Sequence, residues 1–532
     1  MLGDVVREAA RRFGDTPVIV TEEGHILTYA QLDRLSDEVA AGMEARGIRR
    51  GQGDVVGLLM SSGPGYVVAY SPAAKIGAVT AGVNERLSPP EKVACLTVAQ
   101  PSLVIAEDEV CAALVSQMSP ASSETGTQVE VAASCDPTDS LLADLRVQEA
   151  TTEPLDENPD RPVAIVFTSG TTGLPKGALF CDRQLDAISE ADGGRRFGAG
   201  GKGLGSTSMA HLGTMTKLPQ SLRGGGTTFL MKRWSAGGAL EMVERHRITT
   251  LGGIPTQIAL MLRHEKFSST DVSSVRLIAL GGGPSAPSLV REAREKFGIP
   301  IVVRYTCTEA GVGTGTMPDD PPVDAEESVG TPRPGVEVTI RDFGEAAGAR
   351  DADAGARDAE ADRTDGPELP ASEIGEVCLR SEAVMAGYFR DPEATRAVLT
   401  SDGAVRTGDL GYVDERGRLH LCGRAKEMYV RGGYNVFPLE VEAVLCEHPS
   451  VAHVAVAPRP DPVMGEIGVA VVVLRDGASP PLLEDLRKHA EGRLAHHKMP
   501  EALLVMDELP RTAMEKVDRR ALQTIVEAPE PD

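Results

Sequence analysis

The sequence has few aromatic residues, a deficit of positive charge and no long apolar run. Aromatic residues make up 4% of the 532 residues, and 54 Lys and Arg face 78 Asp and Glu, a formal net charge of -24. Such a surface disfavours nucleic acid or an anionic membrane as a general partner. No apolar stretch approaches the length of a membrane span. A phosphate ligand would therefore need a local binding device.

The eight cysteines are scattered, with no CxxC pair and no His/Cys cluster at zinc spacing. They indicate reduced thiols in a cytoplasm. The N-terminal stretch MLGDVVREAARRFGD carries acidic residues and lacks the apolar core of a signal peptide. We therefore expect a soluble, cytoplasmic protein.

The length predicts more than one domain. Apolar residues at three- and four-residue steps predict a helix over residues 29–48. Short apolar runs bounded by turn residues then alternate with helical segments, which predicts an α/β fold with parallel sheets wrapped by helices. The runs read as buried strands are 54–60, 101–108, 162–169, 227–231, 248–255, 275–283 and 299–305. A long helical segment is expected between 162–169 and 227–231.

Two changes in composition divide the chain. Residues 342–372 are rich in Ala, Asp, Gly and Arg and almost free of large apolar residues, which predicts a flexible acidic insertion in a hairpin-like region. After about residue 425 a helix–strand–strand–helix pattern predicts a compact α+β unit. We expect a large domain over 1–425 and a small domain over 426–532.

The stretch TSGTTGLPKG, residues 168–177, is small, rich in hydroxyls and singly basic. It follows an apolar run, and a strand leading into a glycine-rich turn can present backbone N–H groups to an anion. The spacing is not that of a Walker A loop. The composition predicts a phosphate cradle; the alternative is an ordinary flexible turn.

This loop resembles the phosphate motif of the adenylate-forming superfamily, which includes acyl-CoA synthetases, nonribosomal-peptide adenylation domains and firefly luciferases. Further motifs follow in the order of that family: LGGGPSAP (280–287), RYTCTEAG (304–311), the continuous segment 406–442 and LPRTAMEKVDRRAL (509–522). The resemblance, closest to bacterial acyl-CoA ligases, implies a large domain of parallel sheets with a distorted barrel and a small, mobile α+β C-terminal domain.

The resemblance also implies an activity. Family members join a carboxylic acid to AMP with ATP and Mg²⁺, release pyrophosphate, and commonly pass the acyl group to coenzyme A. Two anions must meet at the α-phosphate, so catalysis rests on positioning and charge neutralisation.

Site residues are carried over by motif. The β- and γ-phosphates would be held by Thr168, Ser169, Gly170, Thr171, Thr172, Gly173 and Lys176. The adenine side would be formed by Gly282, Gly283, Pro284, Tyr305 and Thr306, with Tyr305 packed on the ring.

The remaining residues of the large domain would contact the α-phosphate, Mg²⁺ and the ribose. Thr308 would touch the α-phosphate, and Glu309 would hold Mg²⁺ through a hard oxygen ligand. Asp409 would accept from both ribose hydroxyls, with support from Arg424. Each of these side chains, met alone, would be read as an ordinary core or surface residue.

The last motifs belong to the small domain. Lys516 would bridge the α-phosphate and the attacking carboxylate, and Lys426 would be the hinge about which the small domain turns. In the second pose Gly432 and Gly433 would line the pantetheine tunnel; the alternative for this pair is a simple turn.

Two residues depart from the family pattern. Glu515 stands where a glycine usually precedes the lysine, and Thr306 stands where a glycine usually follows the tyrosine. Both bear on adenylation, so an alternative is a protein that only thioesterifies an acyl-adenylate supplied by a partner enzyme. The retained Lys176, Glu309 and Lys516 argue against it.

The acid is expected to be bulky and apolar, such as an aryl, polycyclic or terpenoid acid. His211 in SMAHLGTM (208–215) matches a family residue beside the acyl pocket, and Ala210 stands where an aromatic residue is common. No Asp lies in this stretch to pair with an amine, which disfavours an amino acid.

The motifs are compatible with more than one acyl acceptor and more than one activity. No carrier-protein domain follows the lysine motif, which favours coenzyme A or a separate carrier as acceptor. An acyl-AMP ligase that loads a carrier protein, a luciferase-type oxygenase, and a binding protein that kept the fold without the chemistry stay as competing classes.

Overall fold

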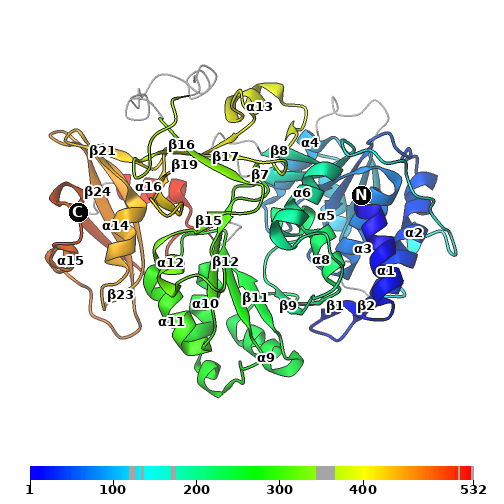
Figure 1. Ribbon diagram of the computed structural model, residues 1–532, viewed down its shortest axis with the longest axis horizontal. Coiled ribbons are helices and arrows are strands. Elements are labelled where there is room, and N and C mark those ends of the chain that lie inside the picture. Colours follow the sequence, from blue (N-terminus) through cyan, green and yellow to red (C-terminus); the bar gives the residue numbers. More distant parts are fainter. Residues whose placement is uncertain (119–126, 133–136, 169–174, 343–365, 513–515, 529–532) are drawn as a thin grey trace.

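The structure, a computed structural model, describes residues 1–118, 127–132, 137–168, 175–342, 366–512 and 516–528. Within these ranges the chain forms four β-sheets, of nine, seven, four and five strands. Figure 1 shows the C-terminal part in orange and red at one end of the long axis and the N-terminal helices in blue at the other. The green and yellow segments lie between them.

The seven-stranded sheet has the order β18-β8-β7-β4-β3-β5-β6. Its strands are β3 (Val55–Leu59), β4 (Val79–Gly82), β5 (Leu103–Ala106), β6 (Gln128–Val131), β7 (Pro162–Thr168), β8 (Lys176–Cys181) and β18 (Gly387–Tyr388). The five strands from β3 to β7 pair in parallel, and only β8 and β18 run antiparallel to their neighbours. The helices of this part are α1 (Leu2–Phe13), α2 (Tyr29–Ala45), α3 (Pro64–Ile76), α4 (Pro89–Ala99), α5 (Glu109–Val115) and α6 (Asp182–Gly193).

The nine-stranded sheet has the order β15-β14-β13-β12-β11-β9-β10-β1-β2. Its strands are β1 (Pro17–Thr21), β2 (Ile26–Thr28), β9 (Lys202–Gly205), β10 (Thr227–Leu230), β11 (Thr250–Gly253), β12 (Leu277–Gly281), β13 (Ile301–Tyr305), β14 (Thr314–Gly315) and β15 (Thr331–Pro332). The central strands are parallel and the edges antiparallel. The accompanying helices are α7 (Leu212–Met215), α8 (Leu218–Gly224), α9 (Ala236–His246), α10 (Pro255–Arg263), α11 (Pro287–Phe297) and α12 (Pro322–Glu327).

A four-stranded antiparallel sheet, β16-β17-β19-β20, follows in the chain. Its strands are β16 (Glu337–Arg341), β17 (Gly375–Arg380), β19 (Val405–Val413) and β20 (Leu419–Arg424), with helix α13 (Pro392–Val398) between β17 and β19. Strands β16 and β17 pair from Glu337–Arg380 to Arg341–Glu376, so the segment predicted as an insertion does connect two hairpin strands. Most of that segment, 343–365, lies outside the described residues.

The C-terminal sheet, β22-β21-β24-β23 with β25 beside β24, is separate from the others. Its elements are β21 (Tyr429–Arg431), β22 (Tyr434–Val436), α14 (Pro438–Leu445), β23 (Val451–Asp461), β24 (Gly465–Leu474), α15 (Leu483–Ala490), β25 (Ala502–Met506) and α16 (Arg519–Glu527). Buried apolar residues of β23, β24, α14 and α15 form a core of their own, which is what an independent small domain requires.

The expected fold class is confirmed: a mixed α/β chain with a large N-terminal sheet region and a smaller C-terminal domain. The helix predicted over 29–48 is α2, which begins after Thr28 through a reciprocal capping box with Gln31. One expectation is wrong. The segment after the 162–169 run opens as strand β8 before helix α6, so the TSGTTGLPKG loop joins two antiparallel strands. The sequence of β8, KGALFC, is too short to show whether its apolar residues repeat with the period of a strand or of a helix.

In the part of the chain that the structure describes, no helix is long and apolar enough to cross a membrane. The cysteines that the structure describes are all free thiols.

Candidate active site

Several of the predicted site residues lie where strands of the two large sheets end. The strands β9, β11, β12 and β13 are parallel neighbours, so the segments after them leave from one edge. These segments carry His211, the Gly282–Gly283–Pro284 turn, and the residues from Thr306 to Glu309. In the other sheet β4 and β7 are parallel, and β7 ends at Thr168. Ligands of open α/β sheets bind outside such carboxyl ends.

The phosphate loop is described only at its two ends. Thr168 ends β7 directly opposite Lys176, the first residue of β8. The residues predicted between them, Ser169, Gly170, Thr171, Thr172 and Gly173, lie outside the described residues. Their predicted contacts with the β- and γ-phosphates stay predictions.

Asp409 forms an ion pair with one residue and a hydrogen bond with another. It lies on β19 opposite Arg424 of β20, and the Arg424 Nε is 3.0 Å from Asp409 Oδ1. The Tyr305 hydroxyl donates to Asp409 Oδ2 at 2.8 Å. Burial, and then the charge of Asp409, raises the pKa of Tyr305, so the phenol remains a donor. Each carboxylate oxygen can accept a further bond, which suits a paired-hydroxyl ligand.

Glu309 and Lys176 share a partner that sequence reasoning missed. The Tyr388 hydroxyl donates to Glu309 Oε1 at 2.6 Å, and Lys176 Nζ lies 5.2 Å from the centre of the Tyr388 ring. The Glu309 carbonyl accepts from the Met385 amide at 2.8 Å. These contacts bring a carboxylate and an ammonium from different sheets to one place.

His211 is held by a second missed residue, Asn84. The Asn84 Nδ2 lies 2.9 Å from His211 Nε2, while its Oδ1 accepts from the Arg86 amide at 3.0 Å. Because the Asn84 oxygen is already bonded to an amide, its nitrogen faces the ring, so Nε2 accepts and a neutral ring carries its proton on Nδ1. Burial, with the charges of Lys516 and Arg86, lowers the pKa of His211 to about 4. The imidazole is therefore neutral at physiological pH.

Lys516 reaches this region from the small domain. Its side chain is exposed. Surrounding protein nevertheless disfavours its charge, and together with the charge of Arg424 this lowers the pKa of Lys516, while Asp409 opposes the shift. The charges of Arg424 and Asp409 thus act on Lys516, and the charge of Lys516 acts on His211.

A partly buried group of charged residues supports the segment that carries Lys516. Thr512 and Lys516 are joined by a backbone hydrogen bond of 2.8 Å, and Arg519 follows at the start of α16. The Arg519 guanidinium donates to both oxygens of Glu442, at 2.6 and 3.0 Å, and its Nε lies 3.4 Å from Glu427. Arg519 therefore ties the segment that carries Lys516 to α14 and to the residue next to the predicted hinge.

The hinge and tunnel residues occupy turns. Lys426 lies between β20 and β21, in a turn closed by the Glu427 and Met428 amides on the Arg424 carbonyl. Gly432 and Gly433 form the two-residue turn between β21 and β22, with φ of +55° and +85°. Two consecutive positive φ angles require residues such as glycine. The simple-turn interpretation is thus sufficient for their backbone, and a tunnel role stays a prediction.

Further predicted residues lie in the segments that follow β12 and β13. Thr308 lies in the turn after β13, where its carbonyl accepts from the Gly311 amide at 3.3 Å. The Thr306 hydroxyl donates to the Cys307 carbonyl at 3.1 Å, which directs it to its own backbone. Gly282 has a φ of +74°, and a Cβ on Gly283 would lie 3.8 Å from Pro255, an ordinary contact. Glu515 lies outside the described residues.

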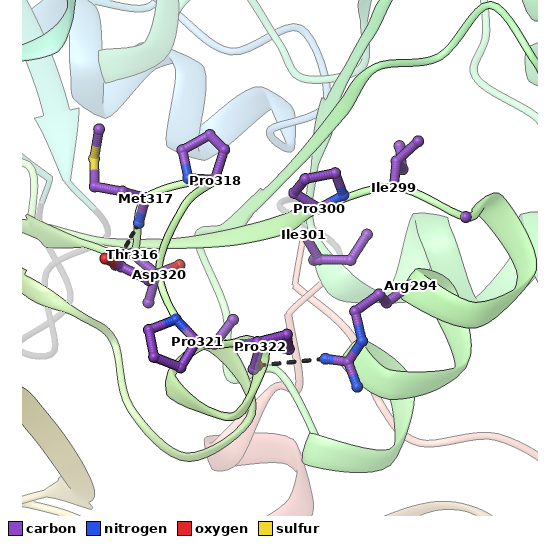
Figure 2. A pocket seen from close by; sticks show the side chains of 12 residues that line it. Arg294, Ile299, Pro300, Ile301, Thr316, Met317, Pro318, Asp320, Pro321 and Pro322 are labelled. Atoms are coloured by element: carbon purple, nitrogen blue, oxygen red, sulfur yellow. Dashed lines mark hydrogen bonds between the residues drawn. The ribbon is translucent and has the colours of Figure 1, made fainter.

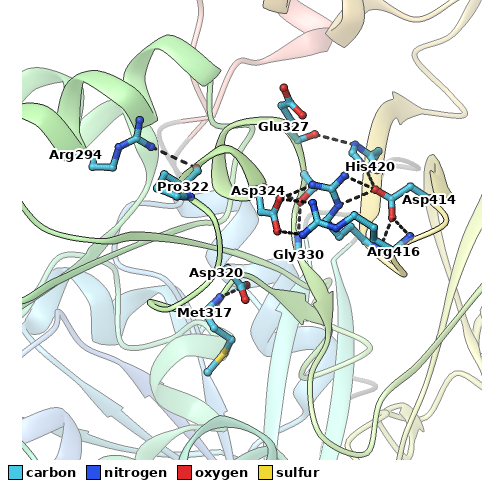
Figure 3. Close-up of polar contacts among 12 residues, drawn as sticks. Arg294, Met317, Asp320, Pro322, Asp324, Glu327, Gly330, Asp414, Arg416 and His420 are labelled. Carbon is cyan, nitrogen blue, oxygen red and sulfur yellow. Dashed lines mark hydrogen bonds and ion pairs between the residues drawn. The ribbon is translucent and has the colours of Figure 1, made fainter.

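The far end of the β19–β20 hairpin is pinned by charge, as Figure 3 shows. Asp324 of α12, which is 4% exposed, accepts from Arg416 at 2.9 and 3.1 Å and from Arg418. His420 bridges the Asp414 carboxylate and the Glu327 carbonyl at 3.0 and 2.9 Å. The hairpin that carries Asp409 and Arg424 is therefore fixed to the large domain at its turn.

A pocket of about 210 Å³ lies elsewhere, on the flank formed by α11 and α12. Figure 2 shows its rim, with Pro300, Ile301 and Pro321 near a hydrogen bond from Arg294 to the Pro322 carbonyl. Of the predicted site residues, none that the structure describes lines this pocket. It is not the candidate site.

The described residues contain no group of three or more His, Cys, Asp or Glu side chains that could hold a metal alone. A Mg²⁺ ion does not require such a group, because it is commonly bound by one or two carboxylates together with substrate phosphates. Glu309 offers such a carboxylate: Tyr388 orients one oxygen, and no described residue is recorded on the other.

The large domain carries side chains suited to a nucleotide near the ends of its strands, and the small domain contributes a lysine to the same region. This is the architecture of an adenylate-forming enzyme. The comparison with protein families makes the membership definite. The AMP-binding enzyme family matches residues 6–356, and the AMP-binding enzyme C-terminal domain matches residues 440–516. The chain belongs to this family, and its class as an AMP-forming acid–thiol ligase is confirmed.

Individual relatives span the whole chain. The indoleacetate–CoA ligase of Aromatoleum aromaticum is 31% identical over 529 residues, covering 98% of this chain and 97% of its own. The fatty acid–[acyl-carrier-protein] ligase ScoC of Streptomyces coeruleorubidus is 31% identical, covering 96% and 93%. The crystal structure of ATP-bound MatB from Rhodopseudomonas palustris has a TM-score of 0.84 at 26% identity, covering 99% of each chain.

Asn84, Tyr388, Glu427 and Arg519 were missed for the same reason. Asn84 and Tyr388 stand in the stretches VNERL and GYFRDP, which have no spacing specific to a chemistry. Glu427 and Arg519 do stand inside recognised motifs, yet nothing in one sequence shows that they meet. These four residues are recognised only by their contacts with residues that are distant in the sequence.

Proposed function

We propose that this protein is an acyl-CoA ligase that activates a bulky, apolar carboxylic acid as its acyl-adenylate and then forms the coenzyme A thioester. The observation that carries the proposal is the convergence of Asp409, Tyr305 and Arg424 with Lys516 of the small domain. Asp409 can accept hydrogen bonds from two hydroxyls of a nucleotide, and Lys516 brings a positive charge for the attacking carboxylate. The domain boundary at 425/426 and the hinge at Lys426 are part of this proposal.

In the first half-reaction a carboxylate oxygen of the acid attacks the α-phosphorus of ATP. The bond to the β-phosphate oxygen breaks, and pyrophosphate leaves with the electron pair. Asp409 would hold the ribose, Lys176 and the loop after Thr168 the departing phosphates, and Lys516 would sit between the carboxylate and the α-phosphate. A bound Mg²⁺ at Glu309 would supply further neutralisation of the phosphate charge.

The electrostatics of the site favour this order of events. The surrounding protein and the charge of Arg424 lower the pKa of Lys516, so the neighbouring residues do not fully compensate its charge. An entering carboxylate and phosphate would supply that compensation. The neutral His211, with a proton on Nδ1, would offer a hydrogen bond to the acyl group without adding charge.

In the second half-reaction the thiol of coenzyme A loses its proton to solvent, and its sulfur attacks the acyl carbonyl. The bond from the acyl carbon to the phosphate oxygen breaks, and AMP leaves with the electron pair. The proposal places a rotation at Lys426 between the two steps, which withdraws Lys516 and brings the Gly432–Gly433 turn to the site. The small domain has its own apolar core, so it can move as a rigid body.

The acid class is proposed from both sequence and relatives. Ala210 is small and buried beside His211, and no Asp stands in residues 208–215 to pair with an amine. One relative is named for indoleacetate, an aryl acid. These observations support an aryl or polycyclic acid over an amino acid.

Two assays on one preparation test the proposal, with a panel of aryl, polycyclic, long-chain and acetate-sized acids. One measures acid-dependent ATP–pyrophosphate exchange, and the other measures thioester formed from synthetic acyl-adenylate and coenzyme A. We expect both activities with bulky acids. Tight use of only acetate-sized acids would contradict the substrate class.

A second candidate is transfer to a carrier protein, favoured by the likeness to a fatty acid–[acyl-carrier-protein] ligase. Exchange activity with no thioester from free coenzyme A would support it. Thioester from the synthetic adenylate without exchange would instead support the half-enzyme that depends on a partner, and Glu515→Gly and Thr306→Gly would be the variants to test for restored adenylation.

A further inference from the structure

Tyr388 stands between two groups that arrive from different sheets. Lys176 opens β8 in the seven-stranded sheet, and Glu309 follows β13 of the nine-stranded sheet. Tyr388 presents its ring to the first, 5.2 Å from Nζ, and its hydroxyl to the second, 2.6 Å from Oε1. In the part of the chain that is described, no other residue is recorded as contacting both charged groups.

The tyrosine is fixed by the short segment that carries it. Strand β18 pairs antiparallel with β8, with Tyr388 opposite Ala178, and the Phe389 amide donates to the Gly177 carbonyl at 2.7 Å. The Tyr388 amide donates to the Thr395 hydroxyl at 2.8 Å. Tyr388 is 8% exposed, so the ring has little freedom to turn away.

The same segment also holds the backbone of Glu309. The Met385 amide donates to the Glu309 carbonyl at 2.8 Å. Residues 385–389 therefore form a strap across the two sheets, bonded to the Glu309 backbone at one end and to β8, next to Lys176, at the other. A shift of this strap would move both charged groups together.

The chemistry of the two contacts is complementary. A hydroxyl that donates to one carboxylate oxygen fixes the rotamer and leaves the other oxygen as an acceptor. An aromatic face attracts an ammonium ion without neutralising it, so the lysine keeps its charge for another partner. Without Tyr388, the Glu309 carboxylate and the Lys176 ammonium would be free to pair with each other. Neither would then be available to bind a ligand.

We propose that Tyr388 is a positioning residue for the adenylating half-reaction: its hydroxyl orients Glu309, and its ring holds Lys176. This inference rests on the proposed function, in which Lys176 meets the phosphates of ATP and Glu309 meets Mg²⁺. It predicts that the two contacts are separable, since one depends on the hydroxyl and the other on the ring.

Two variants separate the contacts. Tyr388→Phe keeps the ring and removes the hydroxyl, whereas Tyr388→Leu removes both. Tyr412→Phe is the matched control, because Tyr412 is stacked on His420 in the charged network away from the site. For each protein, calorimetry measures the binding of a non-hydrolysable ATP analogue with and without Mg²⁺. Pyrophosphate exchange is measured over a range of Mg²⁺ concentrations, and thioester formation is measured from synthetic acyl-adenylate.

For Tyr388→Phe we expect the Mg²⁺ concentration at half-maximal exchange to rise on the order of tenfold, the effect of losing a hydrogen bond to a charged group. Binding of the analogue without Mg²⁺ should change less than about twofold, because the ring still holds Lys176. Tyr388→Leu should also weaken that Mg²⁺-free binding by roughly fivefold. Both variants should retain thioester formation, which also shows that they fold.

Equal losses in both half-reactions, or a Mg²⁺ dependence no different from that of Tyr412→Phe, would show a merely structural role and overturn the inference. The proposed function is judged separately, by whether the natural sequence performs exchange at all. If it does not, the calorimetric comparison with and without Mg²⁺ still decides the role of Tyr388.

Discussion

The two halves of the candidate site are built differently. On the large-domain side, Asp409, Tyr305 and Arg424 are joined by direct contacts of 2.8 and 3.0 Å, and Glu309 is bonded to Tyr388. On the small-domain side, no described contact ties the Lys516 side chain to the large-domain residues; only the interaction of charges is recorded. In the proposed function, the large-domain half is preorganised and the small-domain half is delivered by the rotation of that domain.

The difference extends to what supports each half. The hairpin that carries Asp409 is anchored at its far end to α12 of the large domain through Asp324. The segment that carries Lys516 is anchored by Arg519 to Glu442 and Glu427, all within the small domain. Each anchor keeps its own half rigid without joining the halves. This is the arrangement expected if the halves separate between two reaction steps.

The largest effect should come from the delivered half. Lys516→Ala should lower pyrophosphate exchange by about 100- to 1,000-fold, the usual loss when a charge-stabilising group is removed. Thioester formation from synthetic acyl-adenylate should stay within about threefold, because the proposed rotation withdraws the lysine in that step.

The matched control for this variant is Lys488→Ala, an exposed lysine of α15 in the same domain. An equal loss in both half-reactions for Lys516→Ala would contradict the proposed difference between the preorganised half and the delivered half.

The preorganised half is broken by Asp409→Asn. The change keeps the shape but removes the charge that Arg424 and the Tyr305 hydroxyl face. The KM for ATP should rise by about 10- to 100-fold, the cost of losing charge-assisted hydrogen bonds. Calorimetry with AMP should show the same loss, which ties it to nucleotide binding.

The exposed Asp476→Asn is the control for Asp409→Asn. A change in kcat with an unaltered KM for ATP would mean that Asp409 does not hold the nucleotide.

The turn at Gly433 tests the role of the small domain in the second half-reaction. Gly433 and Gly477 both have positive φ, +85° and +74°, and a Cβ on either would meet no atom within 4 Å. Alanine at either position should therefore cost about 1 kcal/mol of small-domain stability.

Only Gly433→Ala should slow thioester formation, by roughly tenfold, while exchange is retained, because the proposal brings this turn to the site after adenylation. Stopped-flow measurement of the two half-reactions in both variants decides it. Equal behaviour of the two variants would favour the simple-turn interpretation of the glycine pair.

The smallest effect is a pH dependence of stability from His211. Burial and nearby charge lower its pKa from 6.5 to about 4 in the folded protein. Between these values the unfolded chain binds more protons. Stability is therefore complete above pH 6.5 and falls as the pH drops toward 4, by about 1–3 kcal/mol.

His211→Gln should flatten this part of the curve, as measured by the difference in thermal midpoint from the natural sequence between pH 7 and pH 4. The exposed His496→Gln is the control and should leave the slope unchanged. A slope that is the same in all three proteins would mean that His211 is not held neutral.

Much of the architecture was predictable from local sequence. The strands that became β3, β5, β7, β10, β11, β12 and β13 are apolar runs bounded by turn residues. The helix α2 follows from its period and its Thr28–Gln31 capping box. Strand β8 was not predicted, because six residues carry too little period to separate strand from helix.

The family, the order of most elements and the chemistry available at each motif follow from the amino-acid sequence alone, because they depend on neighbouring residues and on their spacing along the chain. Three contacts emerge only when the chain is folded: Tyr388 meets both Lys176 and Glu309, Asn84 sets the proton of His211, and Arg519 supports the Lys516 segment. These contacts join residues far apart in the chain; Asn84 and His211, for example, are separated by 127 positions. Their partners are selected by the packing of whole sheets and domains, which leaves no local trace in the sequence.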